Sequence, residues 1–424
     1  MPTITMRAIV RETERLGLCS SRGLAIIAGF RYLSGETALC VTTWSTAAVR
    51  AAILNPGRKT TMRVVTFGEV MLRMCPPEYM RLRQVLPGTL EVTFGGGEVN
   101  VAVSVAFQGG QSAFVSALPD NPLTDSFEQE LRKLNVGSDL IQRSKAGRFG
   151  VYFVETGANQ RGGTVTYDRD YSSISLTPAS TYNWDKIFTD ASWFHITGIT
   201  PALSAISAEA ALVSVQEAQR RGIPVSCDLN FRKKLWKWQP GKSATALARE
   251  TMRGMMPYID LVIANEEDAD LALGIQAAGT DVEHGEINIA AYEDVAKRIV
   301  ADFPNVSKVA ITLRESISAS HNNWGALLYD ARTKQIHAAP TTPDGKYEPY
   351  EIHNIIDRVG GGDSFSGGLI FALTTPELSD PATALRYAVA ASCLKHSIKG
   401  DFNYASREEI TALMNGSGSG RVQR

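Results

Sequence analysis

The chain has 424 residues, of which 44% are hydrophobic and 21% charged, and its net charge at pH 7 is −1. It is long enough to bury a large core, and its charge gives no general attraction to nucleic acid. Five cysteines without C-x-x-C spacing indicate reduced thiols, and six scattered histidines lack the spacing of zinc ligands. No stretch approaches eighteen continuous apolar residues, so we expect no membrane span. The reduced thiols indicate a cytoplasmic protein, and the small net charge indicates that it does not bind nucleic acid.

The first 61 residues differ from the rest in charge. They hold eight Lys and Arg against three Glu and no Asp, a net charge of +5, whereas the remaining residues total −6. This basic, Ser- and Thr-rich composition is similar to that of an organelle transit peptide. The simpler interpretation is translated upstream sequence with Met62 as the natural start, because the first convincing strand begins at Arg63. We therefore expect residues 1–61 to lie outside the fold.

From residue 63 onward, short β-branched runs alternate with amphipathic stretches. Strands are predicted at 64–67, 113–116, 193–196, 225–227, 261–264 and 309–313, with an antiparallel pair at 325–330 and 335–338. Helices are predicted at 99–108, 125–134, 207–221, 244–255, 292–302, 363–374, 382–398 and 407–415, before a flexible Gly- and Ser-rich tail at 416–424. The alternation predicts an α/β fold over residues 62–415, with a doubly wound, mostly parallel sheet flanked by helices.

Two segments interrupt this alternation. Polar and apolar residues alternate over 149–155 and again over 164–169, with turn-forming residues between them, which predicts a β-hairpin. The Pro-rich stretch 71–94 is also strand-like in parts. We expect these segments, from about 71–97 and 148–172, to form a small β-sheet that covers one end of the main sheet as a lid.

Polar residues directly follow several of the predicted strands. They are Glu69, His195, Asp228, Asn265 and Arg314. In an open parallel sheet, ligands bind outside the carboxyl ends of the strands. Each of these residues alone is more simply explained as a turn or cap residue, but together they predict one crevice.

The segment after the strand at 225–227 reads Asp228-Leu-Asn230-Phe-Arg232. It places an acid, an amide and a guanidinium on one side of an extended chain. The guanidinium of Arg232 can bind a carboxylate or phosphate through two parallel N–H bonds. The alternative is a surface ion pair within the basic cluster 232–234, and the residues alone favour neither.

A second glycine-rich segment, Gly95-Gly96-Gly97-Glu98-Val-Asn100, precedes the helix predicted at 99–108. Its bare backbone is suited to receive sugar hydroxyl groups, and Asn100 adds a donor and an acceptor. The alternative is a flexible hinge to the lid. Both interpretations can hold together.

The stretch Asp357-Arg-Val-Gly360-Gly361-Gly362-Asp363 places three glycines and an acid where an apolar helical pattern begins. The unpaired N–H groups of a helix N-terminus bind anions, and glycines allow an anion to approach the backbone closely. We therefore predict that Gly360, Gly361 and Gly362 form an anion hole for phosphate, with Asp363 as a base. The alternative is that Asp363 only caps the helix.

Two other glycine motifs are excluded by inspection. A dinucleotide fingerprint that starts at Gly360 requires glycine where the chain has Phe365. A P-loop that ends at Ser243 requires glycine where the chain has Trp236. Neither of these nucleotide-binding motifs is supported.

These segments resemble the motifs of the ribokinase-like (PfkB) carbohydrate kinases, and the resemblance covers residues 63–415. The family's Gly-Gly followed by Asn-x-Ala is present as Gly96-Gly97-Glu-Val-Asn100-Val-Ala102. Its D-T-x-G-A-G-D-x-F motif is present as residues 357–365, with Gly361 in place of the usual alanine. Within the family, segments 152–153, 167–169, 228–232, 265–268 and 400–401 are most similar to kinases of 2-keto-3-deoxygluconate.

The resemblance implies ATP-dependent phosphorylation of 2-keto-3-deoxygluconate to 2-keto-3-deoxy-6-phosphogluconate, with Asp363 as base and the backbone of 360–363 as anion hole. It places Arg169 and Arg232 at the carboxylate of a small sugar acid. The implied substrate contacts are Gly96, Gly97, Asn100, Tyr152, Tyr167, Arg169, Arg232 and Asp401. The implied nucleotide contacts are Asn265, Thr312, Arg314, Gly360 and Gly362.

The cofactors implied by the resemblance are ATP and Mg²⁺, with a monovalent cation such as K⁺ near Asp357. The family's N-x-x-E motif ends here in Asp268, which becomes the implied Mg²⁺ contact. Its T-L-G-x-x-G loop reads Thr312-Leu-Arg314 at the start, so we expect Arg314 to meet phosphate where relatives have glycine.

Two other functions remain as alternatives. A kinase for another sugar, such as fructose or ribose, is the alternative within the family, and the paired cations Arg169 and Arg232 favour an acid. A non-catalytic sugar-acid sensor on the same fold is the second alternative, and the retained Asp363 argues against it. Since exposed edges of lid strands often pair between subunits, we also expect a homo-oligomer.

Overall fold

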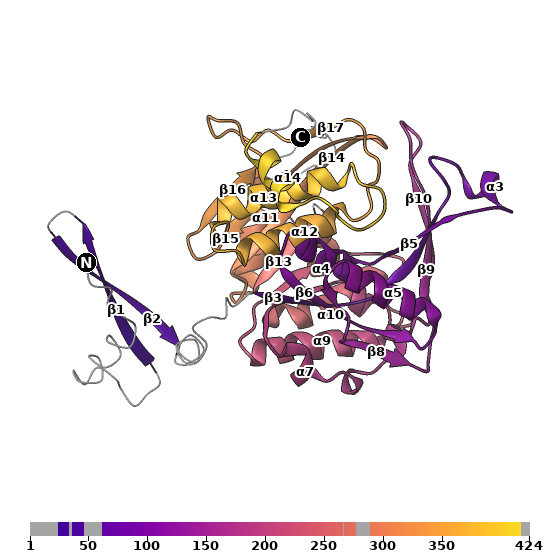
Figure 1. Ribbon diagram of the computed structural model, residues 1–424, viewed down its shortest axis with the longest axis horizontal. Coiled ribbons are helices and arrows are strands. Elements are labelled where there is room, and N and C mark those ends of the chain that lie inside the picture. Colours follow the sequence, from indigo (N-terminus) through magenta and orange to yellow (C-terminus); the bar gives the residue numbers. More distant parts are fainter. Residues whose placement is uncertain (1–23, 34–35, 46–61, 266, 277–288, 417–424) are drawn as a thin grey trace. The chain divides into compact units, whose positions relative to one another are not determined.

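The computed structural model describes residues 24–33, 36–45, 62–265, 267–276 and 289–416 (Figure 1). The chain forms two compact units, residues 1–61 and 62–424. In the first unit, the described residues form an antiparallel pair of strands, β1 (Leu24–Leu33) and β2 (Glu36–Ser45). The sequence analysis predicted no strands there. Of the tail predicted at 416–424, all but Gly416 lies outside the described residues.

The second unit is built on one large mixed sheet. Its strands are β3 (Arg63–Phe67), β6 (Gln111–Pro119), β7 (Val136–Gly137), β8 (Ile141–Ser144), β11 (Ala191–Thr197), β12 (Val225–Asp228), β13 (Leu261–Ala264), β14 (Lys308–Ser318), β15 (His321–Asp330), β16 (Gln335–Ala339) and β17 (Tyr350–Ile352). The order is β16-β15-β14-β13-β12-β11-β3-β6-β7, with β17 beside β15 and β8 beside β6.

Neighbouring strands are parallel from β14 through β7, as the alternating pattern predicts. In contrast, β15 runs antiparallel to β14, β16 and β17. The long β14–β15 hairpin extends beyond the strand predicted at 309–313, because residues 314–318 continue the ladder as a more exposed ribbon. The mostly parallel α/β fold is confirmed.

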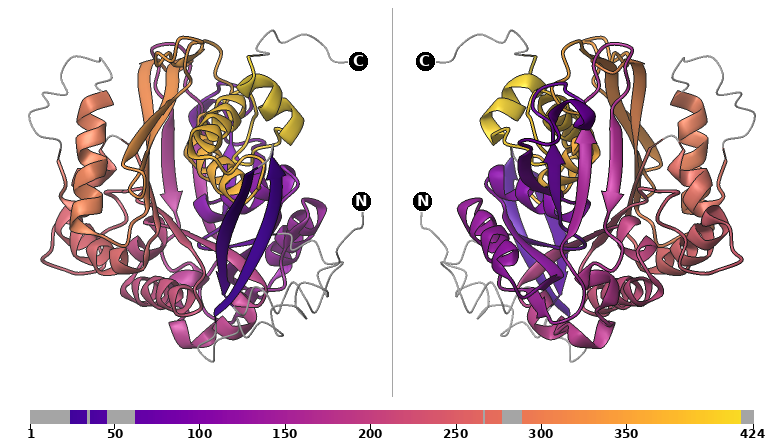
Figure 2. Two further views of the ribbon diagram at one scale, coloured as in Figure 1. Left: turned by 90° about the vertical axis from the view of Figure 1, so that its left-hand side faces the viewer. Right: turned by 90° about the vertical axis from the view of Figure 1, so that its right-hand side faces the viewer.

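Helices cover both faces of the sheet (Figure 2). One face carries α4 (Gly97–Phe107), α12 (Gly361–Leu373), α13 (Pro381–Lys395) and α14 (Arg407–Met414), and the other carries α9 (Ala205–Arg220), α10 (Ala244–Met255) and α11 (Ile289–Asp302). Successive strand residues point to opposite faces. Accordingly, Val64 of β3 packs in the core under α12 and α13, whereas its neighbour Val65 packs in the core under α9 and α10.

The remaining helices are shorter or lie at the margins of the sheet. They are α5 (Pro122–Lys133), α6 (Ser173–Leu176), η1 (Ala179–Thr181), α7 (Trp184–Phe188), α8 (Ile199–Ala202), η2 (Met256–Tyr258) and η3 (Ala269–Leu273). Among the described residues, no helix is both long enough and apolar enough to cross a membrane. Cys75 and Cys227 are buried free thiols, in agreement with the expected reduced state.

A second, four-stranded sheet forms the predicted lid. Its strands are β4 (Met71–Cys75), β5 (Glu91–Gly95), β9 (Gly150–Glu155) and β10 (Thr164–Asp168), in the order β10-β9-β4-β5, and the short helix α3 (Leu82–Val85) connects β4 to β5. The predicted hairpin is the antiparallel pair β9–β10, in which Tyr152 lies opposite Tyr167. In Figure 1, this sheet lies at the right-hand side of the second unit.

Candidate active site

A pocket of about 360 Å³ lies at the carboxyl ends of β12 and β13 and beside the middle of β14, with the lid forming one wall. It brings together predicted site residues from across the chain. Those that line it are Gly96, Gly97, Asn100, Tyr152, Tyr167, Arg169, Arg232, Asn265, Asp268, Thr312, Arg314, Gly360, Gly361, Gly362, Asp363 and Asp401. Asp357 is not part of the lining, and neither are the strand-end residues Glu69 and His195.

The glycine loop leads into α12 as the sequence predicts, but the helix begins two residues earlier. Its N-cap is Gly360, and Asp363 lies in the first turn, so the alternative that Asp363 is the cap is wrong. Gly360 has φ +82°, and an added Cβ would lie 2.1 Å from the carbonyl oxygen of Asp401. Only glycine fits there without strain. The first N–H groups of α12 have no partner within the helix and open toward the pocket.

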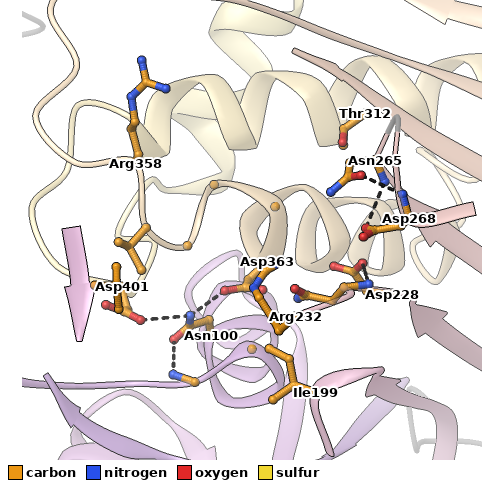
Figure 3. A pocket seen from close by; sticks show the side chains of 18 of the residues that line it. Asn100, Ile199, Asp228, Arg232, Asn265, Asp268, Thr312, Arg358, Asp363 and Asp401 are labelled. Atoms are coloured by element: carbon orange, nitrogen blue, oxygen red, sulfur yellow. Dashed lines mark hydrogen bonds between the residues drawn. The ribbon is translucent and has the colours of Figure 1, made fainter. Parts of the chain in front are cut away.

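Asp363 is held by a hydrogen bond from the other glycine-rich segment. Asn100 of α4 donates from Nδ2 to the Asp363 carboxylate at 2.6 Å (Figure 3). The pKa of Asp363 is raised to about 6, chiefly by burial and also by the nearby Asp401, although the Asn100 hydrogen bond and the charge of Arg232 lower it. A carboxylate with a pKa near the working pH is suited to general base catalysis.

Asp401 is buried, and its oxygens are already bound by protein donors. Oδ1 accepts from Tyr152 at 2.5 Å and from Arg73 at 2.9 Å, and Oδ2 lies 3.4 Å from Asn100 Nδ2. Burial and the Asp401 charge raise the pKa of the Tyr152 hydroxyl, which therefore stays protonated and donates. Asp401 is thus placed to orient Tyr152 and Asn100 as well as to line the pocket.

Asp357 lies outside the pocket wall and is 5% exposed. Its Oδ2 accepts from Arg73 at 2.5 Å and from the Gly400 amide at 3.0 Å, and its Oδ1 accepts from the Val359 amide at 3.0 Å. The carboxylate is therefore neutralised by a guanidinium. The expectation that it contacts a monovalent cation does not fit this donor set, so we assign no cation to it.

The two arginines expected at a substrate carboxylate differ in their surroundings. Arg169 follows β10, is 6% exposed and forms a buried ion pair with Glu69, to which its Nε donates at 2.8 Å. Arg232 is exposed, donates to its neighbouring Phe231 carbonyl and has no carboxylate within ion-pair distance among the described residues. Arg232 therefore has its charge available in the pocket, and the surface ion pair proposed as its alternative is not formed.

Two acidic side chains, Asp228 and Asp268, lie on the opposite wall of the pocket. Asp228 ends β12, and burial together with the charges of Asp268 and Asp363 raises its pKa. Asp268 accepts the Phe231 amide at 3.0 Å and the Asn265 amide at 3.3 Å. Mg²⁺ is usually held by one or two carboxylates plus substrate phosphates, and Asp228 and Asp268 fit that role. Among the described residues, no group of three His, Cys, Asp or Glu could hold a metal alone.

Two of the strand-end residues do not reach the crevice. His195 is fully buried within β11, bonds Ser226 at 2.9 Å through Nδ1, and has its pKa lowered to about 3 by burial. Its placement was wrong because β11 continues to Thr197, two residues beyond His195, so the histidine lies inside the strand and not after it. Glu69 is buried behind Arg169 and is likewise absent from the lining.

Sequence reasoning missed three residues in or beside the site. Arg73 interrupts the apolar run of β4 and is 2% exposed, so a charged residue inside a strand was the available signal. Arg358 also lines the pocket, but its Nε donates to the Ala319 carbonyl at 2.9 Å, and in Figure 3 its side chain points away from Asp363. Trp324 lines the pocket as well, and no sequence pattern indicated it.

The sequence pattern of the pfkB family of carbohydrate kinases matches residues 61–403. The chain belongs to this family. The kinase is 42% identical to a crystallised 2-dehydro-3-deoxygluconokinase from Thermotoga maritima, with a TM-score of 0.74 over 84% of this chain and 100% of that one.

Two curated relatives extend this similarity. The kinase is 28% identical to the 2-dehydro-3-deoxygalactonokinase of Haloferax volcanii, over 85% of this chain and 99% of the relative. It is 27% identical to the 2-dehydro-3-deoxygluconokinase of Bacillus subtilis, over 72% of this chain and 81% of the relative. The expected family, fold and enzyme class are thereby confirmed, and a sugar is the class of substrate.

The family motifs of this kinase are far apart in sequence but adjacent in the fold. Asn100 belongs to the first signature and Asp363 to the second, and their side chains are hydrogen bonded although 263 residues separate them. The two signatures thus form one wall of the pocket. Kinases of the family use ATP.

Proposed function

We propose that this kinase transfers the γ-phosphoryl group of ATP to the primary hydroxyl of 2-keto-3-deoxygluconate, giving 2-keto-3-deoxy-6-phosphogluconate and ADP. The observation that carries the proposal is the available Arg232 guanidinium, which faces the same pocket as Asp363 and the glycine loop. A substrate with a carboxylate at one end and a primary hydroxyl at the other can bind Arg232 through the carboxylate and present the hydroxyl to Asp363. The named activity of the Thermotoga maritima relative supports this choice.

Asp363 acts as the general base. It takes the proton from the primary hydroxyl as the hydroxyl oxygen forms a bond to the γ-phosphorus, and the bond from that phosphorus to the bridging oxygen breaks to release ADP. The backbone N–H groups from Gly361 to Asp363 donate to the negative charge that develops on the transferred group. The hydrogen bond from Asn100 orients the carboxylate for this role.

The sugar acid is held between the lid and the loop after β12. Arg232 binds the substrate carboxylate, and Arg169, oriented by Glu69, contributes from the lid. Tyr152 and Tyr167 lie opposite each other on β9 and β10 with ring centroids 6.1 Å apart, and they cover the sugar from the lid side. The segment at Gly96 and Gly97 offers a backbone surface for hydroxyl groups.

The nucleotide is assigned to the β13–β14 side of the pocket. Asn265 directly follows β13, Thr312 lies in the middle of β14, and Arg314 adds a cation where the phosphates would lie. Mg²⁺, when bound, supplies positive charge that neutralises the phosphate oxygens, and Asp268 with Asp228 would hold it. These carboxylates lie on the wall opposite Asp401 (Figure 3).

A second candidate substrate is 2-keto-3-deoxygalactonate, the epimeric sugar acid. It is favoured by the name of the Haloferax volcanii relative. Both acids carry the carboxylate and the primary hydroxyl that Arg232 and Asp363 require. The two differ only in the configuration of one hydroxyl, which no charged contact described above discriminates.

The deciding experiment measures ADP release with ATP and Mg²⁺ and, in parallel, 2-keto-3-deoxygluconate, 2-keto-3-deoxygalactonate, gluconate, fructose and ribose. We expect turnover with the keto acids, and a decrease in kcat of about 10²- to 10⁴-fold in Asp363→Asn, the range for a positioned base. Equal turnover with a neutral sugar would remove the role of the arginines. No turnover, with ligands that still raise the melting temperature, would favour the non-catalytic sensor.

A further inference from the structure

Arg73 is a buried guanidinium with no place in the reaction described above. It lies in the middle of the lid strand β4 between Leu72 and Met74, and it is 2% exposed. It is not part of the pocket lining. Its Nη1 donates to Asp401 at 2.9 Å and its Nη2 donates to Asp357 at 2.5 Å. One lid side chain therefore joins two carboxylates from the body of the kinase.

Each of these carboxylates organises a different part of the site. Asp357 accepts the amides of Val359 and Gly400, which ties the entrance of the glycine loop to the segment after α13. Asp401 accepts from Tyr152 and lies 3.4 Å from the Asn100 amide nitrogen, which in turn donates to Asp363. A continuous chain of polar contacts runs from β4 to the base.

The charge balance of this cluster depends on Arg73. Asp357 and Asp401 are buried and Asp363 beside them is half-buried, and burial of unpaired carboxylates is unfavourable. The other charged or titratable groups that face Asp363 are Arg232 and Asp228 beside β12 and Lys395 of α13. Lys395 is fully buried and donates to the Ile398 carbonyl at 3.0 Å. Arg73, in contrast, donates directly to two of the three carboxylates, Asp357 and Asp401.

We propose that Arg73 is a positioning residue for phosphoryl transfer: by bridging Asp401 and Asp357 from the lid, it aims Asp363 and shapes the glycine loop when β4 is docked. The proposal rests on the proposed function of the pocket as a kinase site. It assigns to the lid a second task besides covering the sugar. The glycine loop and the base are then correctly arranged only while the lid strand is in place.

The first test compares kcat and KM across pH 5–9 for the full-length wild type, Arg73→Gln and Arg73→Lys, with the sugar that the wild type phosphorylates best. For Arg73→Gln we expect kcat to fall about 10- to 100-fold, as when groups that support a directly acting residue are removed. The acid limb of kcat should move up by at least about half a pH unit, because Asp401 then faces Asp363 without its cation. Arg73→Lys, which keeps the charge, should keep the acid limb and lose less activity.

Arg221→Gln is the matched control. Arg221 also forms a two-carboxylate cluster, with Glu217 and Asp185, but it lies outside the pocket. Its loss should lower the melting temperature without moving the pH profile. If Arg73→Gln behaves in the same way, with kcat within about twofold and an unmoved acid limb, Arg73 has only a structural role and the proposal is overturned.

A second measurement does not depend on turnover. Hydrogen exchange of wild type and Arg73→Gln should show faster exchange at the Val359 and Gly400 amides, which donate to Asp357. If the single variant Arg73→Gln unfolds, the same exchange measurement is made on the double variant Arg73→Gln/Asp357→Asn, in which one of the unpaired charges is removed. Unchanged exchange at both amides would overturn the proposal even if the substrate is not the one proposed here, whereas faster exchange in a protein that phosphorylates no sugar would refute only the proposed function.

Discussion

Asp363 combines burial with access to the pocket, and this combination determines how it should titrate. Its pKa is raised to about 6, chiefly by burial, and a base must be deprotonated to accept a proton. We therefore predict that kcat stays level above about pH 7 and falls about tenfold per pH unit below about pH 6. A pH series of kcat at saturating substrates checks this. A level profile down to pH 5 would contradict the assignment of Asp363 as the base.

Arg232 is the residue whose charge is available to a substrate carboxylate. We predict that Arg232→Gln raises KM for the sugar acid about 10- to 100-fold, the loss of one charged hydrogen bond, with a smaller change in kcat. Lys234→Gln, an exposed neighbour in the same basic cluster, is the control and should leave KM within about twofold. Equal effects of the two substitutions would indicate general electrostatic attraction and not a specific contact.

At the scale of elements, the N-terminus of α12 depends on its backbone conformation. Gly360 combines φ +82° with close contact to the Asp401 carbonyl, whereas a Cβ on Gly362 would meet no atom within 4 Å. We predict that Gly360→Ala lowers the free energy of unfolding by about 1–3 kcal/mol and abolishes most turnover. Gly362→Ala should have a free energy of unfolding at least as large as that of the wild type, because alanine forms helices more readily than glycine. Denaturant unfolding of both variants compares them directly.

Helix α4 buries a carboxyl group in its first turn. Oε1 of Glu98 accepts from Thr197 and Thr200, Oε2 has no partner among the described residues, and burial raises the pKa from 4.5 to about 7. A raised pKa means that the folded state binds the proton more tightly than the unfolded state. The contribution of Glu98 to stability is therefore fully present below about pH 4.5 and is lost as the pH rises through about 7. Relative to Glu98→Gln, the wild type should lose up to about 3 kcal/mol of stability between pH 5 and pH 8. A constant difference between the two proteins would contradict this.

At the scale of the whole molecule, the chain divides into residues 1–61 and 62–424, and the family pattern starts at residue 61. All residues that line the pocket belong to the second unit. We therefore predict that the protein shortened to 62–424 retains kcat and KM within about twofold. A large loss of turnover in a shortened protein that still melts cooperatively would show that the extension contributes to the site.

Much of the fold and site could be predicted from sequence because their signals are local. The alternation of strand and helix patterns indicated the parallel sheet, and the hairpin at β9–β10 followed from a period of two. The glycine loop before α12 predicted an anion site, since binding an anion at a helix N-terminus needs only a few consecutive residues. Asp363, Asn100 and Arg232 were found in this way, and they line one pocket.

The partners of the charged residues were decided only by the tertiary structure. Arg73 and Asp401 are 328 residues apart, and Arg169 meets Glu69 across 100 residues, so no local pattern could pair them. The same holds for Asp357, which we expected to contact a monovalent cation and which the structure pairs with the guanidinium of Arg73. His195 was misplaced because β11 continues two residues beyond it, so its side chain is buried inside the strand. Composition and periodicity determine which elements form, but the balance of buried charge depends on which elements come together.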